Sequence, residues 1–83
     1  MKIKDMVIKW WYLPGTPRGT ICKIEKPNSF NLGFAICGLK DAFKKDTGRR
    51  ISLARAMKNA GLSKEERTLI WEEYRNMSPN KRW

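Results

Sequence analysis

Residues 30–45 read "FNLGFAICGLKDAFKK", and the spacing of apolar residues changes inside this stretch. In its first half the apolar residues alternate, which puts Phe30, Leu32, Phe34 and Ile36 on one face of a strand. In its second half the alternation stops, and apolar residues recur at helical spacing further along the chain. The change predicts a chain that begins with strands and ends with helices.

Two further strands are expected before this stretch. Residues 6–13 ("MVIKWWYL") are β-branched and aromatic, and residues 20–25 ("TICKIE") alternate. The connections at 14–19 and 26–29 are short and contain proline, as turns do. Short connections favour neighbouring antiparallel strands. We therefore expect a three-stranded antiparallel sheet.

The first of these strands carries two adjacent tryptophans, Trp10 and Trp11. Neighbouring side chains in a strand point to opposite faces of the sheet. Helices from a chain this short can cover only one face, so Trp11 remains on the other. We expect Trp11 to be buried at a contact between subunits of a homo-oligomer. The alternative is a partly exposed tryptophan on a small domain.

The helical part of the chain is expected to be interrupted by residues 46–48, "DTG". Asp46 or Thr47 then serves as the N-cap of a helix over residues 49–60. Gly61 is expected to end that helix in the usual C-terminal manner.

Two further segments flank this helix. Residues 39–45 can form a short helix or a turn. Ser63, with Glu66 three residues later, predicts a capping box at the start of a last helix. The apolar stripe of that helix is Ile70, Tyr74 and Met77.

The length of 83 residues is enough for one domain. The expected fold class is α+β, with a three-stranded antiparallel sheet followed by two to three helices. The single domain covers residues 1–83, with strands within 6–37, helices within 39–77 and a frayed tail at 78–83. With two cysteines and no histidine, a zinc site is not expected, and Cys22 and Cys37 are expected to be free thiols.

The formal net charge of +10 indicates an anionic partner, either a nucleotide or nucleic acid. The positive charge is concentrated in residues 40–58. Gly48, Arg49 and Arg50 at a helix start, with exposed backbone N–H groups, would form a phosphate site. A solvated basic face, with Arg49 paired to Asp46, is the alternative. The expected ligand-binding residues are Lys40, Lys44, Lys45, Gly48, Arg49, Arg50, Arg55 and Lys58.

The sequence argues against an enzyme. It has no histidine, no recognised spacing of carboxylates and no phosphate-binding loop of the Walker type. A DNA-reading helix starting at Ser63 would present four glutamates to the phosphate-lined groove, which is unfavourable. We therefore expect non-catalytic binding of a small anionic nucleotide, with no cofactor or metal. Non-specific binding of nucleic acid is the alternative.

The segments "GFAIC" and "KDAFKKDTGRRISLARA" resemble a signature of small phage-encoded proteins. The matching residues are Gly33, Phe34, Ala35, Lys40, Asp41, Phe43, Lys44, Lys45, Gly48, Arg49, Ile51, Arg55 and Ala56. The chain has Leu39 where the pattern has proline. The signature is similar to that of the phage anti-Thoeris sponge proteins. This resemblance implies a small oligomer that sequesters a cyclic ADP-ribose-type or cyclic oligonucleotide signal of a bacterial defence system.

The first residues, "MKIKDMVIKWWYL", do not have the composition of a secretory signal, because Asp5 and Lys9 interrupt the apolar run. No apolar run is long enough to span a bilayer. We expect no membrane partner. With the resemblance, the expected location is the cytoplasm of an infected bacterial host.

Overall fold

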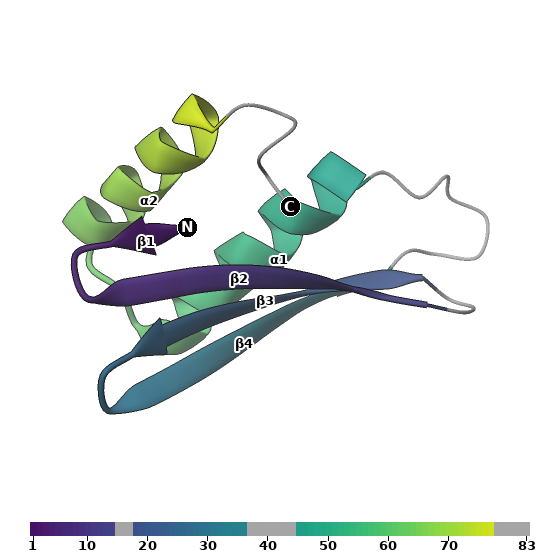
Figure 1. The fold of residues 1–83 in the computed structure, drawn as a ribbon, viewed down its shortest axis with the longest axis horizontal. Helices are drawn as coiled ribbons and strands as arrows, with labels where there is room; N and C mark the ends of the chain where they lie inside the picture. The colour runs from purple at the N-terminus through teal and green to yellow at the C-terminus, as the bar shows by residue number, and fades with distance from the viewer. Residues whose placement is uncertain (15–17, 37–44, 78–83) are drawn as a thin grey trace.

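The chain folds into a four-stranded antiparallel sheet followed by two helices, and its class is α+β (Figure 1). The computed structural model describes residues 1–14, 18–36 and 45–77. The expected tail at 78–83, Cys37 and most of the expected short helix at 39–45 therefore lie outside the described residues. The elements are β1 (Lys2–Ile3), β2 (Met6–Leu13), β3 (Gly19–Lys26), β4 (Ser29–Ile36), α1 (Lys45–Ala60) and α2 (Lys64–Asn76).

The sheet is a meander in which the strand order follows the chain, β1-β2-β3-β4. Its last three strands confirm the predicted ones, whereas β1 is an additional edge strand that the sequence prediction missed. β1 has two residues, too few to show alternation, and its turn contains Lys4 at φ 53°. Lysine seldom adopts this left-handed conformation, so its sequence gives no turn signal. The N-terminal ammonium extends the pairing by donating to the carbonyl of Ile8 at 2.9 Å.

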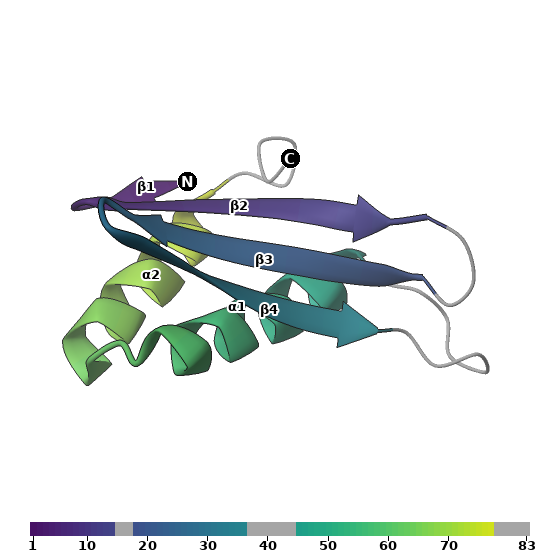
Figure 2. The same ribbon diagram turned by 90° about the horizontal axis from the view of Figure 1, so that it is seen from below.

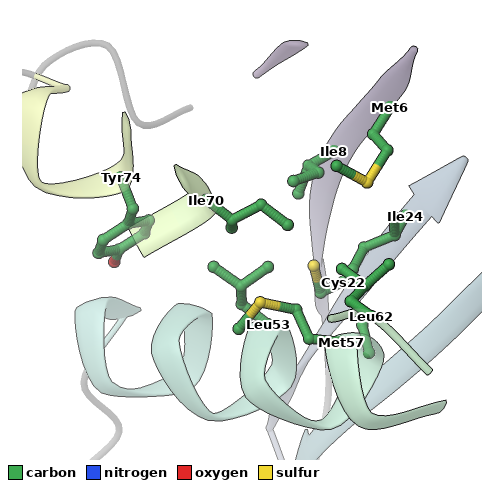
Figure 3. Close-up of a cluster of buried hydrophobic side chains, with 10 residues drawn as sticks. Met6, Ile8, Cys22, Ile24, Leu53, Met57, Leu62, Ile70 and Tyr74 are labelled. Atoms are coloured by element: carbon green, nitrogen blue, oxygen red, sulfur yellow. The ribbon is translucent and has the colours of Figure 1, made fainter. Parts of the chain in front are cut away.

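Both helices lie on the same side of the sheet (Figures 1 and 2). The core forms between them and the sheet face that they cover, as the close-up in Figure 3 shows. The covered face includes the predicted alternating residues Thr20, Cys22 and Ile24, all fully buried. The buried apolar cluster consists of Met6, Ile8, Cys22, Ile24, Leu53, Ala56, Met57, Leu62, Ile70 and Tyr74.

Helix α1 approaches β4 most closely at Gly33. A Cβ atom at this position would overlap the backbone of Ser52 and Ala56 on the helix. Only glycine therefore permits the observed distance between helix and strand, and Ala56 provides the small surface opposite it. The Gly-Phe-Ala segment thus determines how α1 lies on the sheet.

Helix α1 already includes residues 46–48, so the predicted break at Gly48 is wrong. Glycine inside a helix costs about 1 kcal/mol relative to alanine, which tertiary packing readily offsets. Asp46, expected as an N-cap, instead forms ion pairs with residues one helical turn later. Its carboxylate lies 3.4 Å from Arg49 Nη2 and 3.2 Å from Arg50 Nε. The two arginines therefore lie inside the helix and not at its first residues.

Helix α2 begins as predicted with a capping box. The Ser63 hydroxyl accepts from the Glu66 N–H at 3.2 Å, and the Ser63 N–H donates to Glu66 Oε1 at 3.1 Å. The preceding Gly61 has φ 64°, the left-handed conformation expected after the end of α1. Ile70 and Tyr74 are buried, which confirms their place on the apolar stripe.

Candidate functional site

The guanidinium of Arg49 is turned into the protein, where it joins β2, α1 and α2. The residue is only 6% exposed. Its Nη1 donates to the Tyr12 hydroxyl at 2.8 Å, and its Nε donates to the Tyr74 hydroxyl at 3.4 Å. Its Nη2 donates to Asp46 Oδ1 at 3.4 Å. The expectation that Arg49 presents its guanidinium to a ligand therefore needs revision, because these partners hold it inside the fold.

The tyrosines on either side of Arg49 complete this buried polar network. The Tyr74 hydroxyl donates to Asp46 Oδ1 at 2.7 Å. Burial raises the pKa of both Tyr74 and Tyr12, so both hydroxyls keep their protons at neutral pH. Burial alone would lower the pKa of Arg49, but the hydroxyls of Tyr74 and Tyr12 outweigh it and the pKa is raised. Arg49 is therefore charged inside the fold.

Arg50, unlike Arg49, points outward into an open groove between α1 and α2. The groove has a volume of about 610 Å³ and is lined by Asp46, Arg50, Trp71, Tyr74 and Arg75. The Arg50 side chain is 55% exposed, and its Nε lies 3.2 Å from Asp46 Oδ2. Arg75 forms no hydrogen bond or ion pair with the described residues. The groove thus presents two guanidinium groups and an indole ring.

Trp71 is held at the groove by packing against the ring of Tyr74. Its ring meets the ring of Tyr74 edge-on, with 5.9 Å between centroids and an interplanar angle of 83°. Trp10 contacts the same tyrosine at 6.0 Å, and its indole Nε1 donates to the carbonyl of Arg49 at 3.3 Å. The rings and the buried network together fix the floor of the groove.

Trp71 and Arg75 were not among the residues expected from the sequence. They are four residues apart, so they share one face of α2. Four glutamates give this helix a negative net charge, so its sequence does not by itself indicate an anion site. The spacing of an aromatic residue and an arginine was the feature that could have found them.

Arg55 lies at the edge of the sheet and not in the groove. Its Nη1 donates to the carbonyl of Phe34 at 2.6 Å. One turn later, the Asn59 amide donates to the carbonyl of Leu32 at 2.7 Å. These bonds satisfy outward-facing carbonyls of β4 and protect that edge against pairing with another strand. Arg55 therefore has a structural role in the described fold.

The other expected residues that the structure describes do not line the groove either. Lys45 lies with its Nζ 5.0 Å from the centroid of the Tyr12 ring. Gly48 is buried within α1, and Lys58 is exposed in the last turn of the same helix. Lys40 and Lys44 lie outside the described residues. Of the six expected residues that the structure describes, Arg50 is the one on the groove lining.

The described residues contain no group of three or more His, Cys, Asp or Glu side chains that could hold a metal ion. Cys22 is a buried free thiol, and burial raises its pKa to about 12. Within the part of the chain that the structure describes, neither helix is long and apolar enough to cross a membrane.

Comparison of the chain with protein-family models, curated proteins and solved structures finds no match. The resemblance to phage sponge proteins therefore rests on its signature residues and stays a prediction.

Proposed function

We propose that the protein binds a phosphate-bearing nucleotide in the groove between α1 and α2. The observation that carries this proposal is that Arg50, Arg75 and Trp71 line the same open groove. Guanidinium groups bind phosphate through paired hydrogen bonds, and an indole ring provides a stacking surface for a base. The groove volume of about 610 Å³ is in the range of small-molecule sites.

Asp46, which lines the groove beside Arg50, supports this assignment. Its Oδ2 orients the Arg50 side chain, and its carboxylate can accept a hydrogen bond from a ribose hydroxyl. An incoming phosphate competes with Asp46 for Arg50. Arg75 has no such competitor among the described residues, so it is expected to make the stronger contact with phosphate.

We propose that binding occurs without catalysis and withdraws the nucleotide from its receptor. Asp46 is the one carboxylate on the described lining, and it is already bonded to Tyr74, Arg49 and Arg50. A general acid or base needs a group that is free to exchange a proton with the substrate. Together with the signature, this supports sequestration of a cyclic nucleotide or cyclic ADP-ribose-type messenger by a phage protein in the bacterial cytoplasm.

We further propose that the protein acts as a homo-oligomer. The side chain that suggested this, Trp11, is 45% exposed on the sheet face that the helices leave uncovered. An exposed tryptophan among other apolar side chains is typical of a subunit contact.

The direct test is to incubate the full chain with a mixture of linear and cyclic nucleotides. The protein is then recovered, and mass spectrometry identifies the molecules that it retains. For the retained nucleotide, calorimetry should give a fixed stoichiometry. Arg50→Ala and Arg75→Ala should each weaken binding by about 10- to 100-fold, since each removes a charge-assisted hydrogen bond. Trp71→Ala should also weaken it.

Lys58→Ala is the matched control, because it removes one positive charge from an exposed position on α1 away from the groove. It should leave binding unchanged. Equal losses for Lys58→Ala and Arg50→Ala would indicate diffuse charge attraction and would remove the groove assignment. Retention of no nucleotide by the folded protein would contradict the proposed function as a whole.

One observation favours non-specific binding of nucleic acid as the second candidate. Arg50 and Lys58 are both exposed and lie about 12 Å apart along the axis of α1, so these two charges do not form a compact pocket. A long polyanion can contact cations at such a separation. Its affinity would increase with strand length and fall steeply with salt concentration. Length-dependent gel shifts at physiological salt, with no nucleotide retained, would favour this candidate.

A further inference from the structure

The sheet face opposite the helices is apolar at one end and charged at the other. The register of the strands arranges its side chains in rows across β2, β3 and β4. The row of Trp11, Ile21 and Phe34 is followed by the row of Leu13, Gly19 and Ile36. We call Leu13, Trp11, Ile21, Phe34 and Ile36 the apolar patch.

The apolar patch is continuous and well exposed. Trp11 is 45% exposed, Phe34 44% and Ile36 54%. Leu13 and Ile36 close over Gly19, since their terminal methyl groups lie 3.2 Å and 2.9 Å from the place of a Cβ there. No charged side chain belongs to these two rows. In the absence of a partner, water would contact a contiguous apolar surface.

The other two rows carry the charges of this face. They contain Lys9 and Lys23 in one row, and Glu25 and Phe30 in the next. Lys23 Nζ lies 3.6 Å from Glu25 Oε2 and 5.2 Å from the centroid of the Phe30 ring. A surface for single-stranded nucleic acid combines stacking rings with cations that contact phosphate. Here the patch itself holds no cation, Lys9 and Lys23 lie in the adjacent row, and Lys23 is paired with a carboxylate, so nucleic acid is the poorer fit.

We infer that the apolar patch is covered by the same patch of a second copy, in a face-to-face dimer with two-fold symmetry. This inference rests on the proposed homo-oligomer and assigns its surface and partner. A two-fold axis through the patch places apolar side chains against apolar side chains. When this axis runs across the strands, it also turns the lysine rows of the two copies toward opposite ends, because the patch occupies one end of the face. This arrangement separates like charges, which matters for a chain with a net charge of +10.

The size of the face predicts a weak dimer. Three strands of eight residues make a face of roughly 350 Å² before the relief of the side chains is counted, and the two rows of the apolar patch occupy about half of it. This is below the roughly 800 Å² per partner of a standard interface. We therefore expect a dissociation constant in the micromolar range, with monomer and dimer in exchange.

The dimer has a consequence for nucleotide binding. The groove lies on the helical side of the sheet, and the apolar patch lies on the opposite side. The two grooves of a dimer are therefore separate, each lined by described residues of one chain. In this dimer the helices of the two chains lie on the outer sides. Their first turns therefore cannot come together around the two-fold axis to form one shared pocket. We expect one nucleotide per chain, bound with the same affinity by monomer and dimer.

The test is light scattering of the full chain from low micromolar to several hundred micromolar. The average mass should rise from that of the monomer to twice that value. Phe34→Lys should keep the protein monomeric throughout the range. Phe30→Lys makes the same change on the same strand and face, but outside the patch, and should dimerise like the original chain. Ile36→Lys is a second patch variant, and thermal melting confirms that each variant is folded.

A monomer at the highest concentration would overturn the inference. Normal dimerisation of a folded Phe34→Lys or Ile36→Lys variant would also overturn it. The protein would then still be a homo-oligomer, but one that forms through another surface. Binding of oligothymidylate that requires Trp11 and Phe34 would show nucleic acid to be the occupant. Incubation with the nucleotide mixture distinguishes failure of the proposed dimer from failure of the proposed nucleotide site. Retention by monomeric Phe34→Lys supports separate grooves, whereas loss of retention together with the dimer would show a shared site.

Discussion

Replacing Arg49 with alanine should destabilise the fold before it affects any ligand. The short hydrogen bond to the Tyr12 hydroxyl, at 2.8 Å, is charge-assisted and contributes about 1.5–3 kcal/mol. The bonds to Tyr74 and Asp46, at 3.4 Å, are long, and with the lost packing of the side chain they add about 1 kcal/mol. Removal of a buried cation also relieves its desolvation, which offsets part of this sum.

The expected net loss is about 2–3 kcal/mol from the free energy of unfolding. A chain of this length has a total of about 4–12 kcal/mol. The melting temperature should therefore fall by about 10–20 °C. Thermal melting followed by circular dichroism measures this loss. Arg50→Ala is the control, because it removes the neighbouring, half-exposed arginine and should change stability by less than about 1 kcal/mol.

The two variants should thus separate stability from binding. Arg49→Ala should melt early, and its folded fraction should retain nucleotide. Arg50→Ala should melt normally and bind weakly. If Arg49→Ala melts within a few degrees of the original chain and loses nucleotide binding, the buried network is not what holds Arg49. The sequence-based expectation of a ligand-facing Arg49 would then be correct.

Three further results are expected. Gly33→Ala should lose about 3 kcal/mol or fail to fold, since its Cβ overlaps the α1 backbone, and urea denaturation that shows a loss under about 1 kcal/mol would contradict the close packing. In a Cys37→Ser background, Cys22 should react with a thiol reagent only as the protein unfolds. Fast labelling of the native protein would argue against burial. Because the pKa of Cys22 in the folded chain is about 12, the stability contributed by the protonated thiol is complete below about pH 9 and is lost as the pH rises toward 12. Ser63→Ala should cost about 1 kcal/mol. Glu66→Gln, which keeps the length of the capping side chain but cannot titrate, should reduce the loss of stability on acidification below about pH 4.3, because the Ser63 N–H holds the pKa of Glu66 below its usual value, and an unchanged acid profile would contradict the capping box.

The sequence was sufficient where the structure depends on local signals. Alternation identified β3 and β4, β-branched and aromatic composition identified β2, and the spacing from Ser63 to Glu66 identified the start of α2. The sequence was insufficient where contacts between residues far apart in the chain determine the position of a side chain. Arg49 is buried because Tyr12 and Tyr74 meet it from 37 and 25 residues away, and no local pattern reports such a meeting.

The candidate site was predicted less well than the fold, for a related reason. A groove between two helices depends on which faces meet, so its lining combines Arg50 from one helix with Trp71 and Arg75 from the other. The sequence indicated the net charge, from which we predict an anionic partner. It did not indicate that most of the basic residues of α1 would be used elsewhere, as Arg55 is at the edge of β4.

The signature that resembles phage proteins therefore takes on a structural meaning. In the described part of the chain, Gly33 allows α1 to approach β4, Ala56 packs opposite it, and Arg55 bonds to the strand edge. Arg49 joins the helix to β2 and α2. These roles determine how the helix lies on the sheet. A chain with the same signature should share this packing whatever it binds, and the side chains that distinguish its ligand should be sought at the positions of α2 that face the groove.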